Sequence, residues 1–175
     1  MINIFIFIIS IVLVAVFASI FVFKNKKPKY NRVVKVLQEF LTYAQKEQIE
    51  GLMVLEMADK LDNFMATGKR FVAKVLSVNL AKIFSKDSVN NEGAVILRGD
   101  EIVAVNATLA GAGGHYLNSK QRIASAITSA TDALAIEFSR GEIWAFMSGQ
   151  RTEISPGRLV SILTFKSSKK KISIN

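Results

Sequence analysis

The fold is decided by residues 92–132, which read EGAVILRGDEIVAVNATLAGAGGHYLNSKQRIASAITSATD. Within this stretch, two apolar runs at 94–97 and 102–105 flank the turn residues Gly99 and Asp100. The pattern predicts a β-hairpin, because glycine readily takes the positive φ that a tight turn needs. A glycine loop and an amphipathic helix complete the stretch, so strand and helix signals already alternate inside it.

The helix at the end of this stretch begins with a basic cluster. Ser119 is suited to cap its first turn, and Lys120, Gln121 and Arg122 follow directly. Cations at a helix N-terminus are unusual, because the helix dipole favours anions there. The helix and the two cations can share an anionic ligand such as a triphosphate, so the cluster indicates a phosphate-binding site. The glycine loop at 111–114 matches neither common phosphate-loop spacing and is a weak signal by itself.

The rest of the chain also alternates between helix and strand signals. Before the central stretch, the hydrophobic periodicity predicts four segments: a helix over 32–48, a buried strand over 52–55, an irregular segment over 57–70 and an amphipathic helix over 71–84. After it, the sequence predicts strands over 133–138 and 143–147, joined by a turn at 139–142, and a last short helix over 157–165. This order predicts one α/β domain over residues 32–165, with a mixed β-sheet flanked by helices.

The N-terminus carries a long segment without a charge, from Ile4 to Phe23. A helix of about 20 residues spans the ~30 Å hydrocarbon layer of a bilayer. We predict a retained transmembrane helix over 1–23 rather than a cleaved signal peptide, because no basic region precedes the segment and no convincing cleavage site follows it. The basic linker 24–31 and Arg32 come next. By the positive-inside rule, the chain is then a single-pass protein of the cell membrane with its C-terminal domain in the cytoplasm.

The net charge of +9 is concentrated in two tails. Residues 24–32 hold five basic side chains and the C-terminal tail 166–175 holds four, so the domain between them is neutral. Tails of this kind suit anionic lipid headgroups, whereas a nucleic-acid-binding domain more often carries the charge on its own face. We therefore expect membrane lipid and no nucleic acid among the partners. The lack of cysteine agrees with a reducing compartment.

The order of these motifs resembles the diadenylate cyclase domain family, over about residues 32–165. It is most similar to the membrane-anchored CdaA-type enzymes, and among them to the mollicute forms with a single transmembrane helix. The family's two signatures, Asp-Gly-Ala and Arg-His-Arg, stand here as Glu92-Gly93-Ala94 and Lys120-Gln121-Arg122. The other matching pieces, in order, are Gly51 to Val54, Thr67-Gly68, the run from Val95 to Ala104, and Thr131 to Leu134 before a strand.

The resemblance implies a mixed sheet flanked by helices and the condensation of two ATP molecules into cyclic di-AMP and two pyrophosphates. It implies Mn2+ or Mg2+ as cofactor and a face-to-face contact of two protomers that each hold one ATP. The partners are thus ATP and a second copy of the chain. Glu92, Gly93 and Ala94 take the catalytic positions, with Glu92 as metal ligand. The implied nucleotide and phosphate contacts are Thr67, Gly68, Lys120, Gln121, Arg122 and Ser139.

The altered signatures bear on this chemistry. Glu92 keeps a carboxylate that can bind a metal or activate a 3′-hydroxyl, on a stem one methylene longer. Lys120 keeps the positive charge of arginine but loses its bidentate fork. Gln121 cannot titrate near neutrality and is a poor transition-metal ligand, although its amide can hydrogen-bond a phosphate oxygen. The only histidine, His115, lies close before Gln121, and we expect it to supply part of the missing function as a metal ligand.

Two alternatives to a working cyclase stay open. One is a catalytically weakened or inactive homologue that binds ATP or cyclic di-AMP and acts as a membrane-bound sensor. The other is a structural membrane protein without a ligand. A structural domain has no reason to bring the Glu92 element and the Lys120 element to one cleft, so their convergence would argue against it.

Overall fold

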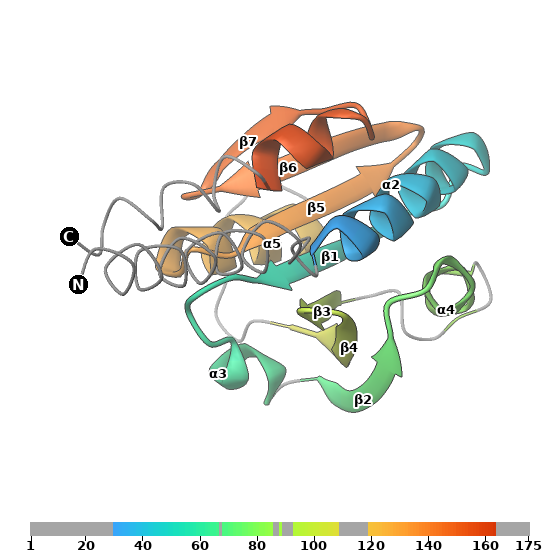
Figure 1. Ribbon diagram of the computed structural model, residues 1–175. Helices are drawn as coiled ribbons and strands as arrows, with labels where there is room; N and C mark the ends of the chain where they lie inside the picture. The colour runs from blue at the N-terminus through green and yellow to red at the C-terminus, as the bar shows by residue number, and fades with distance from the viewer. Residues whose placement is uncertain (1–29, 67, 86–87, 89–92, 109–118, 164–175) are drawn as a thin grey trace, which may run out of the picture. The chain divides into compact units, whose positions relative to one another are not determined.

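In a computed structural model, the chain is described for residues 30–66, 68–85, 88, 93–108 and 119–163 (Figure 1). Among these residues, no helix combines the length and the apolar character needed to cross a bilayer. Three predicted segments lie outside this part of the chain: the transmembrane helix over 1–23, the linker 24–31 apart from its last two residues, and the tail 166–175. Internal contacts divide the chain into two units, residues 1–31 and a domain that begins at Arg32.

Helices and strands alternate along the domain. Their bounds are α2 Tyr30–Lys46, β1 Gly51–Glu56, α3 Asp62–Met65, β2 Lys69–Lys74, α4 Ser77–Ile83, β3 Ala94–Arg98, β4 Glu101–Ala107, α5 Ser119–Ala130, β5 Leu134–Ser139, β6 Glu142–Met147 and β7 Gln150–Glu153. Residues 158–163 are also helical, which confirms the middle of the last predicted helix. The α2 helix, the β3–β4 hairpin, the α5 helix and the β5–β6 hairpin all lie where the sequence predicts them.

The strands form one seven-stranded sheet in the order β2-β4-β3-β1-β5-β6-β7. β1 and β3 are parallel, and every other neighbouring pair is antiparallel. The sheet is therefore mixed, as predicted. The β5–β6 turn places both Arg140 and Gly141 at positive φ, of 51° and 79°, which is the backbone of a two-residue hairpin turn. Glycine at the second turn position explains why this hairpin could be recognised in the sequence.

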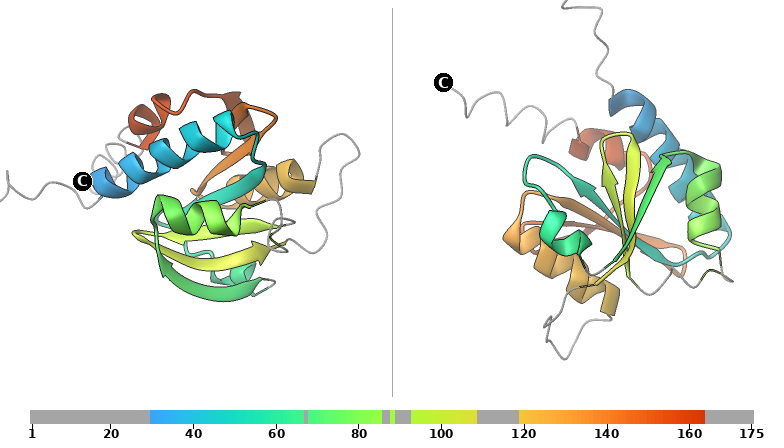
Figure 2. Two further views of the ribbon diagram at one scale, coloured as in Figure 1. Left: turned by 90° about the vertical axis from the view of Figure 1, so that its right-hand side faces the viewer. Right: turned by 90° about the horizontal axis from the view of Figure 1, so that it is seen from below.

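Helices cover both faces of the sheet. Viewed from below, α2 and α4 lie on one side of the sheet, and α3 and α5 lie on the other (Figure 2). Alternate residues of the strands divide between two apolar clusters accordingly. The first cluster joins Met53, Leu55 and Phe138 to α2, α4 and the helical turn at 158–163. The second joins Leu52, Val54 and Ala135 to α3 and α5. Successive residues of a strand therefore contact helices on opposite faces of the sheet.

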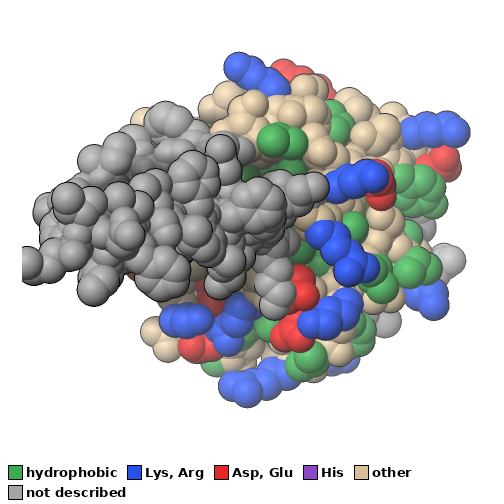
Figure 3. Space-filling view, in the orientation of Figure 1, with side chains coloured by type: hydrophobic (Ala, Val, Ile, Leu, Met, Phe, Trp, Pro, Cys, Tyr) green, Lys and Arg blue, Asp and Glu red, His purple; other side chains and the backbone are tan. Residues whose placement is uncertain are grey.

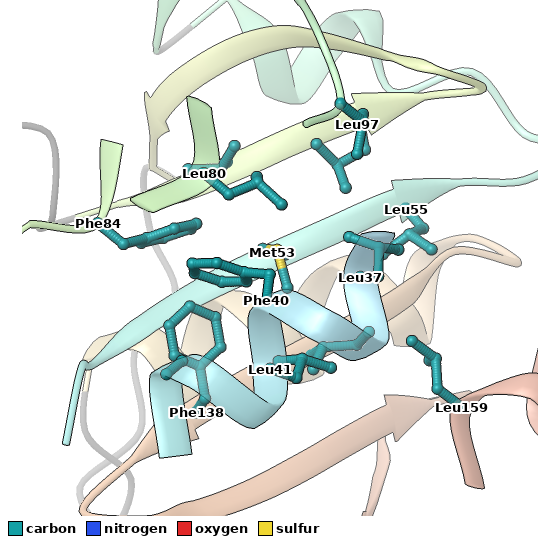
Figure 4. Close-up of a cluster of buried hydrophobic side chains, with 14 of the residues drawn as sticks. Leu37, Phe40, Leu41, Met53, Leu55, Leu80, Phe84, Leu97, Phe138 and Leu159 are labelled. Atoms are coloured by element: carbon teal, nitrogen blue, oxygen red, sulfur yellow. The ribbon is translucent and has the colours of Figure 1, made fainter. Parts of the chain in front are cut away.

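Three aromatic rings form the centre of the first cluster. Phe40 of α2, Phe84 after α4 and Phe138 of β5 point toward one another beneath Leu80 and beside Met53 (Figure 4). The ring centroids of Phe138 lie 5.5 Å from Phe40 and 4.9 Å from Phe84, both in edge-to-face geometry. All three side chains are at most 1% exposed. Edge-to-face pairs of this kind add stability beyond the burial of their area, so this trio anchors both helices to the sheet.

The helix predicted over 71–84 is wrong in its first half. Residues 69–74 form β2, an edge strand that pairs only with β4, and α4 begins at Ser77. Phe71 and Val72, which complete a helical stripe in the sequence, are 42% and 76% exposed and contribute little to a core. Pairing with β4 outweighs the helical spacing here. The irregular segment predicted over 57–70 contains α3, and the polar edge strand β7 was not predicted.

A buried ion pair lies at the carboxyl ends of the parallel strands. Glu56 ends β1 and Arg98 ends β3, and Arg98 donates to both Glu56 carboxylate oxygens at 2.7 Å. The backbone amide of Leu61 and the ammonium of Lys60 also donate to Glu56, at 3.1 and 3.2 Å. Burial by itself raises the pKa of Glu56, but these hydrogen bonds outweigh burial and lower that pKa. Arg98 also donates to Asp62 at 2.7 Å, so the cluster ties α3 to the sheet.

Charges of both signs are interspersed on the surface of the domain. On the face that Figure 3 shows, Lys and Arg side chains lie beside Asp and Glu side chains rather than in one basic stripe. An example is Lys74, which donates to Glu101 at 2.9 Å and to Asp100 at 3.4 Å. These pairs are exposed, so they contribute little to stability. The predicted lack of a nucleic-acid partner stays a prediction.

Candidate active site

Most of the segments that the sequence singles out lie at one edge of the sheet, the edge that is formed by the ends of its strands. The parallel strands β1 and β3 begin at this edge, and their antiparallel neighbours β5 and β4 end there. Gly93 directly precedes β3, Ser139 ends β5, and Gly68 directly precedes β2 beside the end of β4. The topology of a mixed sheet therefore places segments from four distant parts of the sequence at one edge.

Gly68 and Gly93 both lie against the last residues of β4. A Cβ atom built at Gly68 would lie 2.8 Å from the carbonyl oxygen of Val105 and 3.0 Å from the amide nitrogen of Ala107. One built at Gly93 would lie 2.7 Å from the carbonyl oxygen of Ala107 and 2.6 Å from the carbonyl carbon of Asn106. The neighbours in both cases are backbone atoms, which cannot rotate away. Both glycines are thus required by close approach of the chain, and they fix the segments around Gly68 and Gly93 to one strand end.

The end of β4 is irregular at this point. Between the pairs Ala94–Ala107 and Ile96–Ala104, β4 holds one residue more than β3, so the strand bulges. Asn106 lies in the bulge with a φ of 54°, and asparagine tolerates this left-handed conformation better than most residues. Its side-chain Oδ1 is buried without a hydrogen-bond partner among the described residues. Bulges are common beside active sites, because they redirect a strand.

A cavity of about 430 Å³ opens at the same edge, where α5 begins. It is lined by Glu50, Ser119, Lys120, Gln121, Glu137, Ser139, Arg140, Glu142 and Trp144. Side chains two residues apart on a strand point to the same face of the sheet. The strand residues that line the cavity are an even number of residues from Leu52, Ala135 or Phe146, so they lie on the α5 face. The structure therefore brings together three of the predicted phosphate contacts, namely Lys120, Gln121 and Ser139.

Three carboxylates line this cavity, and two of them, Glu50 and Glu137, were missed by sequence reasoning. Glu50 precedes β1, Glu142 begins β6, and Glu137 lies within β5 and is 1% exposed. The hydroxyl of Ser139 donates to Glu50 at 3.0 Å, and the indole nitrogen of Trp144 donates to Glu142 at 3.2 Å. A charged residue inside the apolar run 133–138 was the available signal for Glu137. Nothing comparable marks Glu50, which is an ordinary charge beside a strand in the sequence.

The aromatic wall of the cavity is held from two sides. Besides its hydrogen bond to Glu142, Trp144 has the guanidinium carbon of Arg151 at 4.1 Å from its ring centroid. This distance is within the range of a cation–π interaction. Trp144 is also partly buried against the α5-side cluster. The indole is therefore fixed in orientation, and a fixed aromatic side chain gives a cavity a defined shape.

The other predicted site residues have different positions. Glu92, Thr67, His115 and the glycine loop 111–114 lie outside the described residues. Ala94 is fully buried in β3 and belongs to the α5-side cluster, so its side chain is a core residue. Arg122 lies in the first turn of α5 but does not line the cavity. Their predicted functional roles stay predictions.

The described residues do not by themselves form a complete set of metal ligands. Within the described ranges, no three His, Cys, Asp or Glu side chains converge on one point. Glu50, Glu137 and Glu142 line a common cavity from separate positions. Mg2+ usually binds one or two protein carboxylates and completes its shell with water and phosphate oxygens. The donor set of the cavity fits a cation of this kind that arrives with a phosphate ligand.

Comparisons with known proteins identify the family of the chain and agree with the fold. Residues 38–151 match the family model described as DisA bacterial checkpoint controller nucleotide-binding. The cyclic di-AMP synthase CdaA of Bacillus subtilis is 28% identical over 109 residues, which are 60% of this chain and 40% of that protein. A diadenylate cyclase of Listeria monocytogenes is 26% identical over 113 residues, 62% of this chain and 41% of that protein. The match thus covers about two fifths of the length of these relatives.

Two solved structures are similar to this one. A cysteine double mutant of DacA from Staphylococcus aureus has a TM-score of 0.70 at 21% identity, covering 77% of this chain and 94% of that one. A hypothetical membrane spanning protein from Bacillus cereus has a TM-score of 0.62 at 21% identity, covering 69% of this chain and 62% of that one. At this level of identity the likeness concerns the fold alone, and it confirms the mixed sheet flanked by helices.

Proposed function

The chain belongs to the diadenylate cyclase family, and on this premise we propose that it condenses two ATP molecules into cyclic di-AMP and two pyrophosphates. One observation carries the proposal. Gly93, in the altered carboxylate signature, and Lys120, in the altered basic signature, come from segments at the same sheet edge. Such convergence has no purpose in a structural domain without a ligand. The names of the two curated relatives, a cyclic di-AMP synthase and a diadenylate cyclase, support the same reaction.

The proposed reaction makes clear demands on these residues. The 3′-hydroxyl oxygen of each ATP bonds to the α-phosphorus of the other, the bond from that phosphorus to the pyrophosphate oxygen breaks, and the hydroxyl proton passes to a base. Lys120 and the N-terminus of α5 would balance phosphate charge, and Gln121 and Ser139 would donate hydrogen bonds to phosphate oxygens. Glu92 is the proposed base. Holding both nucleotides in line supplies much of the rate enhancement.

Each chain offers one such site, so the proposed reaction needs two copies face to face. A divalent Mn2+ or Mg2+ would be held by Glu92, with His115 as a further candidate ligand, and when bound it would neutralise phosphate charge. The orientation of Trp144 and the close backbone packing of Gly68 and Gly93 are already set within the single chain. The second protomer therefore has to supply the other nucleotide rather than shape this cavity.

We also place the chain at the cell membrane. The apolar segment from Ile4 to Phe23 is long enough to span a bilayer, and the basic linker after it suits a cytoplasmic flank. The description of the Bacillus cereus neighbour as membrane spanning supports this location. A shared membrane would favour dimers by concentrating the chains. Fractionation of cells expressing the full-length chain tests the location, because a membrane-spanning protein stays with the membranes after a high-salt wash.

The test of activity uses the full-length chain in a nonionic detergent with ATP and either Mn2+ or Mg2+. Chromatography then separates cyclic di-AMP from ATP, and the Glu92→Gln variant is the control. Product that disappears in the variant is the expected result, because glutamine neither accepts the proton nor binds the cation well. No product with either metal, from folded protein that still binds ATP, would favour the membrane-bound sensor that binds ATP or cyclic di-AMP without making it.

A further inference from the structure

Glu137 is a buried carboxylate that the proposed reaction does not use. It lies in β5 with Leu52 of β1 on one side and Trp144 of β6 on the other. Alternation along the strand places its side chain on the α5 face, where Ala133 and Ala135 are ordinary apolar core residues. The residue is 1% exposed, so its carboxylate is largely removed from bulk solvent. Burial of a charge is unfavourable unless other charges or dipoles compensate it.

The surroundings of Glu137 supply that compensation. Lys120 and Gln121 from the first turn of α5 line the same cavity. The N-terminus of this 12-residue helix also carries a partial positive charge that favours an anion. A carboxylate with a purely structural role can pair with a helix N-terminus without a cavity beside it. Glu137 instead lies at the wall of a cavity of about 430 Å³. The carboxylate thus shares the cavity with Lys120 and Gln121, two of the proposed phosphate contacts.

A carboxylate and a triphosphate at one site repel each other. At an effective dielectric constant of about 20, two like charges about 10 Å apart change a binding constant by roughly tenfold or more. A divalent cation between them converts the repulsion into attraction, and Mg2+ commonly binds one protein carboxylate together with phosphate oxygens. Within the described part of the chain no three His, Cys, Asp or Glu side chains form a metal site, and a carboxylate here would share the cation with Glu92 and the phosphate oxygens.

Building on the function proposed above, we propose that Glu137 makes triphosphate binding depend on a divalent cation, which its carboxylate shares with the phosphate oxygens. The site then selects metal-complexed ATP over free ATP. Glu101 serves as the matched control. It begins β4, does not line the cavity and pairs with Lys74 on the surface.

The experiment measures affinity rather than turnover. The full-length chain in detergent is titrated with an ATP analogue that has a methylene group between the α and β phosphorus atoms, once with Mg2+ and once with EDTA. For the wild type and for Glu101→Gln, we expect affinity to fall about tenfold or more without Mg2+. For Glu137→Gln, we expect a fall of less than about threefold, mainly because the free analogue binds better. Glu137→Asp keeps the charge and should keep the dependence on Mg2+.

Three results would overturn the inference. The first is a wild-type affinity that is the same with and without Mg2+. The second is a Glu137→Gln protein that keeps the full Mg2+ dependence although its thermal unfolding profile shows that it is folded. The third is a Glu137→Asp protein that loses the Mg2+ dependence. A wild type that does not bind the analogue even with Mg2+ would instead refute the proposed function.

Discussion

Replacing Arg98 with methionine tests the role of the buried ion pair at the carboxyl ends of β1 and β3. The Glu56 side chain is 2% exposed and accepts four hydrogen bonds, two of them from Arg98 at 2.7 Å. Methionine keeps the length and the apolar stem of the arginine side chain but donates nothing. The Arg98→Met variant therefore leaves a buried carboxylate with two of its four donors, from Leu61 and Lys60.

The size of the effect follows from this geometry. Removing one partner of a fully buried ion pair costs about 3–5 kcal/mol of unfolding free energy. The Arg98 side chain is 36% exposed, so water enters the space it leaves and the penalty is smaller. We expect a loss of about 2–3 kcal/mol at neutral pH. The control Lys74→Met removes only exposed ion pairs and should have a much smaller effect.

The effect should also depend on pH. The folded-state pKa of Glu56 lies below its ordinary value, so the pair stabilises the wild type fully above about pH 4.3, the unfolded value. This stabilisation is lost as the pH falls through the lowered folded-state pKa. In Arg98→Met, burial is no longer outweighed and the pKa of Glu56 rises. The difference in stability between the two proteins is thus largest near neutrality, and it shrinks as the pH falls from the raised pKa of Glu56 in the variant toward the lowered pKa in the wild type.

Urea denaturation of the full-length chain in detergent measures this difference, with fluorescence from Trp144, the only tryptophan, as the probe. A double-mutant cycle with Glu56→Gln isolates the pair, and we expect a coupling free energy of about 1–3 kcal/mol. Additive single effects, or a destabilisation by Arg98→Met that is the same at pH 4 and pH 7, would refute the reasoning.

Two further predictions concern packing. Gly93→Ala forces a methyl group against the backbone of β4, so we expect the unfolding free energy to fall by about 1–3 kcal/mol and cyclic di-AMP formation to be lost. The control Gly157→Ala has open space around it and should change neither quantity. Phe138→Ala removes a ring that contacts both Phe40 and Phe84, and should cost about 3–5 kcal/mol in the same urea assay. A Gly93→Ala protein of wild-type stability, or a loss below about 1 kcal/mol for Phe138→Ala, would contradict these contacts.

The parts of the fold that the sequence predicted are those in which local and tertiary forces agree. The β3–β4 and β5–β6 hairpins combine apolar strands with glycine turns, and α2 and α5 carry continuous apolar faces that meet the sheet. In residues 69–74 the local and tertiary forces disagree. The apolar residues of this segment fit a helical spacing with those that follow, but the segment forms the edge strand β2. Only its partner β4, some 30 residues further along the chain, makes this segment a strand.

The candidate site was predictable in part for the same reason. Lys120, Gln121 and Ser139 stand out through their motifs, and the structure places them on one cavity. Glu137 could not be identified in this way, because an acidic residue in an apolar run has no functional meaning until the neighbouring strands are known. Its place beside Trp144 and across from the α5 start depends on strand register and on which face α5 covers.

The position of the cavity in the sheet follows from how the other edge is used. In open α/β sheets, ligands usually bind beyond the carboxyl ends of the parallel strands. Here Glu56 and Arg98 occupy that position at the ends of β1 and β3, and their ion pair joins α3 to the sheet. The opposite edge is where antiparallel strands end, where two glycines allow close backbone packing and where α5 begins. The ion pair that stabilises the fold and the charges that line the cavity are thus separated along the strands, so Arg98→Met should weaken the fold while leaving the Mg2+ dependence of nucleotide affinity unchanged.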